Sequence, residues 1–245
     1  MPTEKISRAM RSVFLAGCVL GLFLGALSPV GAQHRPPKRE FRAVWVATVK
    51  NIDYPRFAVP DPASLKAEFR QLLDGCQALG LNAVILQVRP AGDAFYPSQY
   101  APWSAFLTGA QGRAPADGFD PLAFYVEETH RRGMELHAWL NPYHATVDLD
   151  TLHLAPEHAF HRHREWLVRY GDQLYFAPAL SEVRDHLLDI VTELLENYDL
   201  DALHLDDYFY PYKILGERFP DSSAFIRYGA GFTDIADWRR DNTDR

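Results

Sequence analysis

The feature that most constrains the fold is a fourfold alternation of short apolar runs with amphipathic stretches of helical period. We expect strands at residues 41–49, 82–88, 134–140 and 201–207. We expect helices at residues 62–79, 121–132, 182–198 and 233–241. This alternation is typical of parallel α/β proteins, because parallel neighbours need a crossover that a helix usually supplies. The nearly continuous apolar run at 41–49 predicts a strand that is buried on both faces.

The N-terminal segment, residues 1–32, reads as a secretory signal. It has a basic start, an uncharged and largely apolar run at 13–27, and a small-residue cleavage pattern. A membrane anchor is one alternative, although a span needs about 20 apolar residues. A lipoprotein box ending at Cys18 is another. We therefore expect an exported protein, periplasmic or extracellular, with no membrane span after cleavage, a polar linker at 33–40 and one domain at 41–245.

The charge of the chain argues against nucleic acid as a partner. The formal net charge is −7, and removal of the basic leader makes the mature chain more negative still. Binding to phosphates needs clustered Lys and Arg, so a neutral or cationic polymer fits better. After cleavage Cys76 is the single cysteine, which leaves no internal disulfide, and its place on an apolar helix face predicts a core residue.

The last expected strand ends in two adjacent carboxylates, Asp206 and Asp207, followed by aromatic residues. Side chains alternate along a strand, so His204 and Asp206 share one face. Glycosidic bond cleavage uses carboxylates that move protons or stabilise positive charge, and flat rings hold sugars. We interpret Asp206 as the catalytic carboxylate and Asp207 as a second carboxylate that orients it or binds the substrate. The alternative is that the pair caps a loop.

Polar and aromatic residues also follow the earlier strands. The candidate sugar-binding residues are His204, Gln87, Arg89, Asp93, Trp103, Asn141, Tyr143 and Tyr208. Amide side chains can donate to and accept from sugar hydroxyls, although Gln87 and Asn141 are equally well explained as loop braces. Arg89 is suited to an acidic sugar group or to an internal pair with Asp93, and we favour the pair.

Three further features carry alternatives that the sequence leaves open. Trp45 and Trp139 are as well explained by the core as by sugar stacking. A histidine-rich stretch that includes His161 and His163 suggests a metal site, but its spacing matches no ligand motif and favours solvated surface. We expect no metal and no cofactor.

Several segments together resemble the glycosyl-hydrolase-like 10 family, a bacterial (β/α)8-barrel group related to α-amylase-type barrels. The matching segments are Arg42–Val49, Asn51–Asp53, Asn82–Pro90, Gly92–Ala94, Pro102–Ser104, Leu107–Gly109, His137–Tyr143, His204–Pro211 and Asp237–Asn242. The resemblance implies a TIM-barrel type α/β fold, of which this chain holds about the first four β/α units and is incomplete at its C-terminus. Tyr54 and His144 stand where the family pattern has Trp and Arg.

The resemblance also implies an activity. It implies an envelope glycosidase, and some relatives act on peptidoglycan glycan stripped of its peptides. In the related barrels the nucleophile lies on strand four, two residues after a basic residue, which the His204-x-Asp206 spacing matches. The general acid of those barrels comes from strand five, and Asp53 and Asp93 are only weak candidates for it here.

The hypothesis from the sequence is a secreted glycoside hydrolase that acts on a cell-envelope polysaccharide by carboxylate acid/base catalysis. The alternatives are a non-catalytic carbohydrate-binding module and an inactive truncated fragment. Half a barrel also leaves open sheet edges, which invite self-association.

Overall fold

The computed structural model describes residues 40–206 and 209–244. The leader, Cys18, the linker except for its last residue, Asp207 and Tyr208 lie outside the described residues. The expectations that rest on them stay predictions. In the described part of the chain, no helix is long and apolar enough to cross a membrane.

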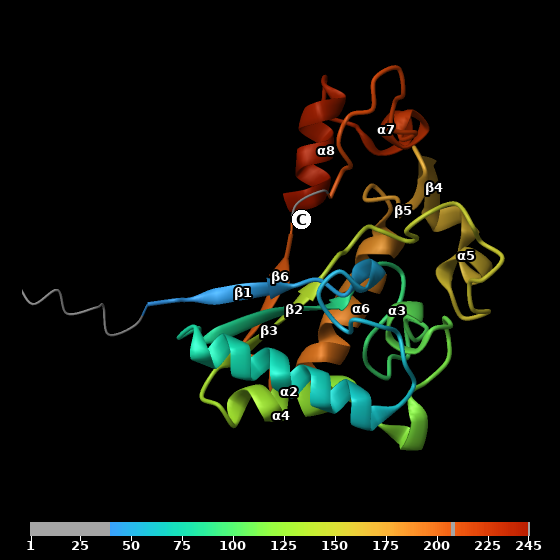
Figure 1. Cartoon of the computed structure of the whole chain (residues 1–245). Coiled ribbons are helices and arrows are strands. Elements are labelled where there is room, and N and C mark those ends of the chain that lie inside the picture. Colours follow the sequence, from blue (N-terminus) through green and yellow to red (C-terminus); the bar gives the residue numbers. More distant parts are fainter. Residues whose placement is uncertain (1–39, 207–208, 245) are drawn as a thin grey trace, which may run out of the picture. The chain divides into compact units, whose positions relative to one another are not determined.

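The domain at residues 41–245 is built on a four-stranded parallel sheet, as the alternation predicts (Figure 1). The strands lie side by side in chain order: β1 (Ala43–Val46), β2 (Ala83–Arg89), β3 (Glu135–Leu140) and β6 (Ala202–Leu205). All four carboxyl ends therefore meet at one edge of the sheet, which is where polar side chains follow the strands.

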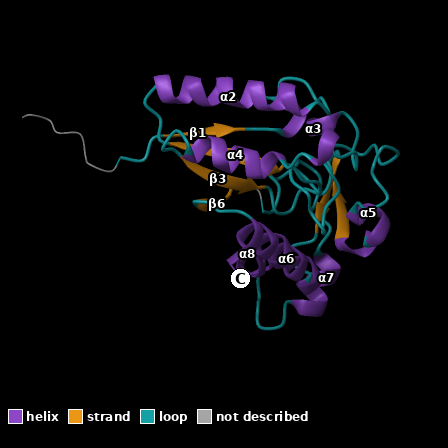
Figure 2. Ribbon diagram, turned by 90° about the horizontal axis from the view of Figure 1, so that it is seen from below, coloured by secondary structure: helices purple, strands orange, loops and turns teal. Residues whose placement is uncertain are grey.

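Three long helices connect these strands and share one buried cluster with the sheet. They are α2 (Pro62–Ala78), α4 (Pro121–His130) and α6 (Ser181–Asn197). Figure 2 shows two of them, α2 and α4, beside the strands. The first two begin at Asp-Pro pairs, where Asp61 and Asp120 each accept two hydrogen bonds from the backbone amides of the first turn.

The main core lies between these helices and the sheet. Leu73, Leu122 and Ile190, one from each helix, share a buried cluster with Leu86 and Ala138 of the sheet. Burying one such side chain contributes about 1.5–3 kcal/mol. Cys76 is also buried in this cluster, as expected, and burial raises the pKa of its thiol.

The opposite face of the sheet carries aromatic and polar side chains. One row of this face runs across three strands from Trp45 to Ile85 and on to His137. Another row runs from Gln87 to Trp139 and on to His204. The expectation that the first strand is buried on both faces is wrong: Val46 of β1 packs in the core beneath the helices, whereas Trp45, on the other face, is 58% exposed.

The segment between β3 and α6 holds an antiparallel hairpin that we did not predict. Its strands are β4 (Leu167–Tyr170) and β5 (Gln173–Phe176), joined by Gly171 and Asp172. Gly171 has a φ of +60°, as the primed turns of two-residue hairpins require. The Gly-Asp pair between two short apolar runs is therefore a sequence signal that would have found this hairpin.

Shorter elements complete the domain. They are the turns η1 (Val49–Asn51), η2 (Ala116–Gly118) and η3 (Arg164–Trp166) and the helices α3 (Ala105–Thr108), α5 (Ala159–Arg162), α7 (Ser222–Tyr228) and α8 (Ile235–Asp244). Helix α8 is the one expected at 233–241, and α7 was not expected.

Candidate functional site

Asp206 directly follows β6, the strand that carries His204 of an aromatic group. Asp206 follows the strand directly and is half-buried, and His204 lies two residues earlier on the same face. The centroid of the His204 ring lies 5.4 Å from that of Trp45 and 6.3 Å from that of Trp139. The two tryptophans are 5.9 Å apart. Trp45, Trp139 and His204 therefore form a ring surface of the kind on which sugars stack, and Asp206 follows His204 by two residues.

Two polar nitrogens in this group are buried without a hydrogen bond. Within residues 40–206 and 209–244, neither Trp139 Nε1 nor His204 Nε2 has a partner. Buried polar atoms are normally paired, and leaving one unpaired costs about 1–3 kcal/mol. Trp139 and His204 are neighbours in register on adjacent strands, so the two unpaired nitrogens belong to one region of this sheet face.

Gln87 lies in the same row of the sheet but is engaged elsewhere. Its Cα is two strands from that of His204, which is about 10 Å. The Gln87 Oε1 atom accepts hydrogen bonds from the backbone amides of Thr48, at 3.0 Å, and Val49, at 2.9 Å. Only 3% of the residue is exposed. This geometry is that of a brace for the loop after β1.

Asn141 is placed similarly, after β3. It is buried, and its Oδ1 accepts a hydrogen bond from the backbone amide of His144 at 3.2 Å. The side-chain amides of Gln87 and Asn141 were explained either as sugar ligands or as loop braces. The contacts in the structure are those of loop braces.

Arg89, the last residue of β2, is fully buried beneath the loops. Its Nη1 donates to the carbonyl oxygen of Asn141 at 2.6 Å, and its guanidinium lies 5.5 Å from the Phe176 ring centroid. Burial lowers the pKa of Arg89, and the charges of Tyr96 and Asp93 act in the opposite direction. We favoured an ion pair between Arg89 and Asp93, but in the described part of the chain these two side chains form no direct ion pair. Their charges interact at longer range.

Asp93 is buried in the loop that follows β2. Burial raises the pKa of its carboxyl group, while hydrogen bonds from Ser104 and Gln111 act in the opposite direction. It lines a cavity of about 190 Å³ together with Gln111, Asp148 and Asp150. Asp93 is thus a carboxyl group with a raised pKa near the carboxyl end of the sheet.

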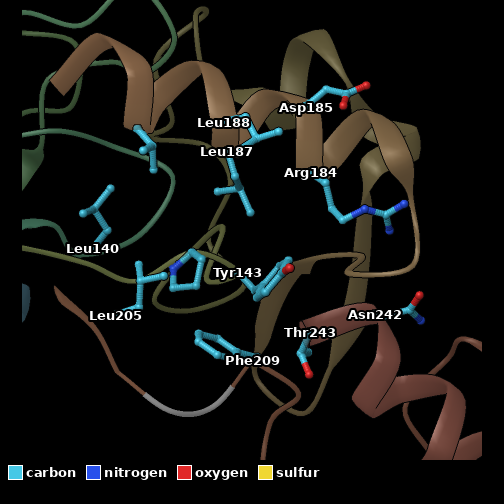
Figure 3. A pocket seen from close by; sticks show the side chains of 12 residues that line it. Leu140, Tyr143, Arg184, Asp185, Leu187, Leu188, Leu205, Phe209, Asn242 and Thr243 are labelled. Atoms are coloured by element: carbon cyan, nitrogen blue, oxygen red, sulfur yellow. The ribbon is translucent and has the colours of Figure 1, made fainter. Parts of the chain in front are cut away.

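Trp103 and Tyr143 both take part in packing. Trp103 packs against the small core of Leu65, Phe95 and Leu107. Tyr143 meets Phe209 edge to face, with ring centroids 5.9 Å apart. Figure 3 shows Tyr143 and Phe209 in a mostly apolar pocket of about 280 Å³ between α6, the end of β6 and α8.

The histidines of the long excursion divide into buried and exposed ones. His158 is fully buried, accepts a hydrogen bond from the Phe160 amide at 3.0 Å and lies 2.9 Å from the Ala145 oxygen, so it caps α5. His161 is exposed, and His163 stacks on Trp166 with ring centroids 3.7 Å apart. The described residues contain no group of three side chains that could hold a metal ion.

Sequence reasoning missed a second aromatic group beyond β6. Tyr170, Tyr210 and Phe219 gather beside Arg239, whose guanidinium lies 5.4 Å from the Tyr210 ring centroid. These residues are far apart in the chain, and no local pattern links them. The hairpin signal at Gly171 was the one clue that would have placed Tyr170 near this group.

Comparison with known proteins gives a consistent result. The sequence model of the family described as "Glycosyl hydrolase-like 10" matches residues 40–245. The chain is 46% identical over 234 residues to "Glycosyl hydrolase YngK" of Bacillus subtilis, covering 95% of this chain and 45% of that protein. It is 38% identical over 220 residues to "Glycosyl hydrolase DigH" of Escherichia coli K12, covering 83% and 49%. The chain thus spans about half the length of these curated relatives.

Among solved structures, similarity is found to an α-L-fucosidase of Paenibacillus thiaminolyticus. The TM-score is 0.47 at 14% sequence identity, over 84% of this chain and 29% of that one.

Proposed function

The chain belongs to the glycosyl hydrolase-like 10 family, and from this premise we propose that it supplies a catalytic and sugar-binding face to a glycoside hydrolase. The observation that supports the proposal is that Asp206 directly follows β6, two residues after His204, whose ring lies beside those of Trp45 and Trp139. In barrels built from β/α units, active sites lie at this end of the strands.

The fold that accompanies this proposal is a (β/α)8 barrel of which the chain forms about four units. Strands in chain order, parallel pairing and helices on one face of the sheet all support it. In such a barrel the helix-free face that carries Trp139 and His204 points to the interior. The open edges of β1 and β6 would then pair with further strands, or with a second copy of this chain.

Asp206 is the proposed catalytic carboxylate, and Asp207 the proposed carboxylate that orients it. His204 and Trp139 offer their unpaired ring nitrogens to sugar hydroxyls, and Trp45 offers a ring face. Glycosidases of the usual type use two carboxyl groups, about 5–5.5 Å apart for retention and about 6.5–9.5 Å apart for inversion. Asp93 is a candidate partner, because burial raises the pKa of its carboxyl group toward the range of a general acid.

The proposed substrate is a cell-envelope polysaccharide, with peptidoglycan glycan strands as the leading case. The basis is the leader-like sequence at 1–32, which predicts export, together with the acidic charge, which argues against nucleic acid. Tyr208, Trp103 and Tyr143 are proposed to contact the sugar from the loops around the site.

A carbohydrate-binding module is the second candidate function. The observation that favours it is that the group of Trp45, Trp139 and His204 can stack and hydrogen-bond a sugar without any second carboxylate.

The test measures turnover with a matched control. The purified chain is incubated with peptide-free glycan strands and with chitooligosaccharides, and new reducing ends are counted. Asp206→Asn is expected to lower the rate at least about 100-fold, the usual contribution of a positioned acid or base. Asp199→Asn, an exposed carboxylate before the same strand, should leave it unchanged. Equal rates for the two variants would refute the assignment, and binding without turnover by the unmodified chain would favour the module.

A further inference from the structure

A pocket outside the sheet face described above is lined by residues of β4, the loop after β6, and helices α7 and α8. Figure 1 shows these helices and β4 at the same end of the domain. Its volume is about 410 Å³. Small-molecule sites typically measure about 300–1,000 Å³, so this pocket has room for a sugar unit.

One wall of the pocket is aromatic. Phe219 is buried, and its ring centroid lies 5.1 Å from that of Tyr210 and 5.6 Å from that of Tyr170. The Tyr170 hydroxyl is held by the backbone: it accepts from the Ile214 amide at 2.6 Å and donates to the Tyr212 oxygen at 3.2 Å. The Tyr170 ring is therefore held in place, and Phe219 packs against it.

The other wall is cationic, in a chain that is acidic as a whole. Arg239 lies over the rings of Tyr210 and Phe219, and its Nε and Nη2 donate to the buried carboxylate of Asp221 at 2.7 and 2.5 Å. This pair orients the guanidinium while 28% of the Arg239 side chain stays exposed.

Two further cations line the pocket. Lys213 and Arg218 are exposed, and across the described ranges 40–206 and 209–244 neither takes part in an ion pair. The pocket's other carboxylate, Glu217, accepts the Gly171 amide at 2.9 Å. Aromatic rings with a surplus of positive charge suit a ligand that has both a flat apolar face and a negative group.

We propose that this pocket is a binding subsite for a sugar unit that carries a carboxylate. The sugar ring packs against the partly exposed ring of Tyr210, which buried Phe219 supports from below, and its carboxylate faces Lys213, Arg218 and the exposed edge of Arg239. This inference rests on the proposed function, because it names a chemical class of substrate for the same site.

The subsite is within reach of the proposed catalytic group. Tyr210 follows Asp206 by four residues, so their Cα atoms are at most about 14 Å apart. A glycan a few sugars long can therefore occupy the subsite while another part of it lies at Asp206. An acidic unit would then fix the register of the glycan relative to the carboxylate.

The test compares two ligands that differ only in charge. Peptide-free glycan fragments of defined length are titrated calorimetrically into Asp206→Asn protein, in which turnover is blocked, alongside the same fragments with their carboxyl groups reduced to alcohols. The acidic form is expected to bind more tightly, and its advantage should shrink as ionic strength rises.

Variants locate the preference in the pocket. Lys213→Gln combined with Arg218→Gln is expected to weaken binding of the acidic fragment about three- to tenfold and to leave the reduced fragment unchanged. The control variant, Arg56→Gln with Arg113→Gln, removes two exposed arginines outside the pocket. It should leave the affinity for both fragments unchanged. All four substitutions are at exposed positions, and melting temperatures check that the variants fold.

Three outcomes would contradict the proposed subsite. Equal binding of the acidic and reduced fragments, equal weakening by the two double variants, or no binding of either fragment contradicts it. Release of reducing ends by the unmodified chain is scored separately. A hydrolase without the charge preference refutes only the subsite, whereas the charge preference without hydrolysis refutes only the catalytic proposal.

Discussion

Replacing Gln87 separates the two explanations of this residue, as a loop brace and as a sugar ligand. Methionine has a similar shape but lacks the acceptor oxygen, so Gln87→Met leaves the amides of Thr48 and Val49 without their partner. The Thr48 bond is fully buried and the Val49 bond partly so. At about 1–3 kcal/mol for each unsatisfied group, the free energy of unfolding should fall by about 3 kcal/mol.

The assay is urea unfolding followed by tryptophan fluorescence, with thermal unfolding as a second measurement. A loss of about 3 kcal/mol corresponds to a melting temperature lower by about 6–12 °C for a chain of this size. Gln77→Met, on the exposed face of α2, is the matched control and should stay within about 0.5 kcal/mol of the parent. If Gln87→Met changes stability no more than Gln77→Met but weakens oligosaccharide binding, the brace is refuted and Gln87 is a ligand.

Two further predictions concern stability. Burial lowers the pKa of His144, His158 and His186 to about 4, so between pH 6.5 and 4 the folded state binds fewer protons than the unfolded state. The stability that these neutral histidines contribute is therefore fully present above pH 6.5 and is lost as the pH falls toward 4. Urea unfolding midpoints measured across this range test the prediction. The His158→Asn variant, whose side chain can still cap α5, should show a shallower dependence of stability on pH. Asp120→Ala removes the cap of α4 and the acceptor of the Tyr198 hydroxyl, and should lower the free energy of unfolding by about 1–2 kcal/mol. Asp120→Asn keeps an acceptor oxygen and should retain most of that stability. Equal losses in the two variants would contradict the capping argument.

Much of the α/β framework could be predicted because its signals are local. Asp-Pro pairs start α2 and α4, and the apolar runs that become β2 and β3 are long enough to read. The sequence did not predict which strands lie at the edges of the sheet. β1 looks like an interior strand by composition, yet Trp45 is exposed, because burial depends on neighbours that the strand's own residues do not specify.

The candidate site was predictable along one strand and not between segments. Alternation along β6 predicts that His204 and Asp206 share one face, whereas the hydrogen-bonding partners of Gln87 and Asn141 come from other loops. Side chains of the same type serve as braces or as ligands according to what lies opposite them. The pocket at Arg239 depends on four segments that meet only in three dimensions.

The β4–β5 hairpin has a mechanical consequence for this end of the domain. Leu167 and Phe176 pack with Tyr143 from the loop after β3, whereas Tyr170 packs with Phe219 from the segment after β6. A displacement of either segment must carry the hairpin along or open one of these two contacts. The ten-residue ribbon 167–176 thus links the position of the loop after β3 to that of the segment after β6.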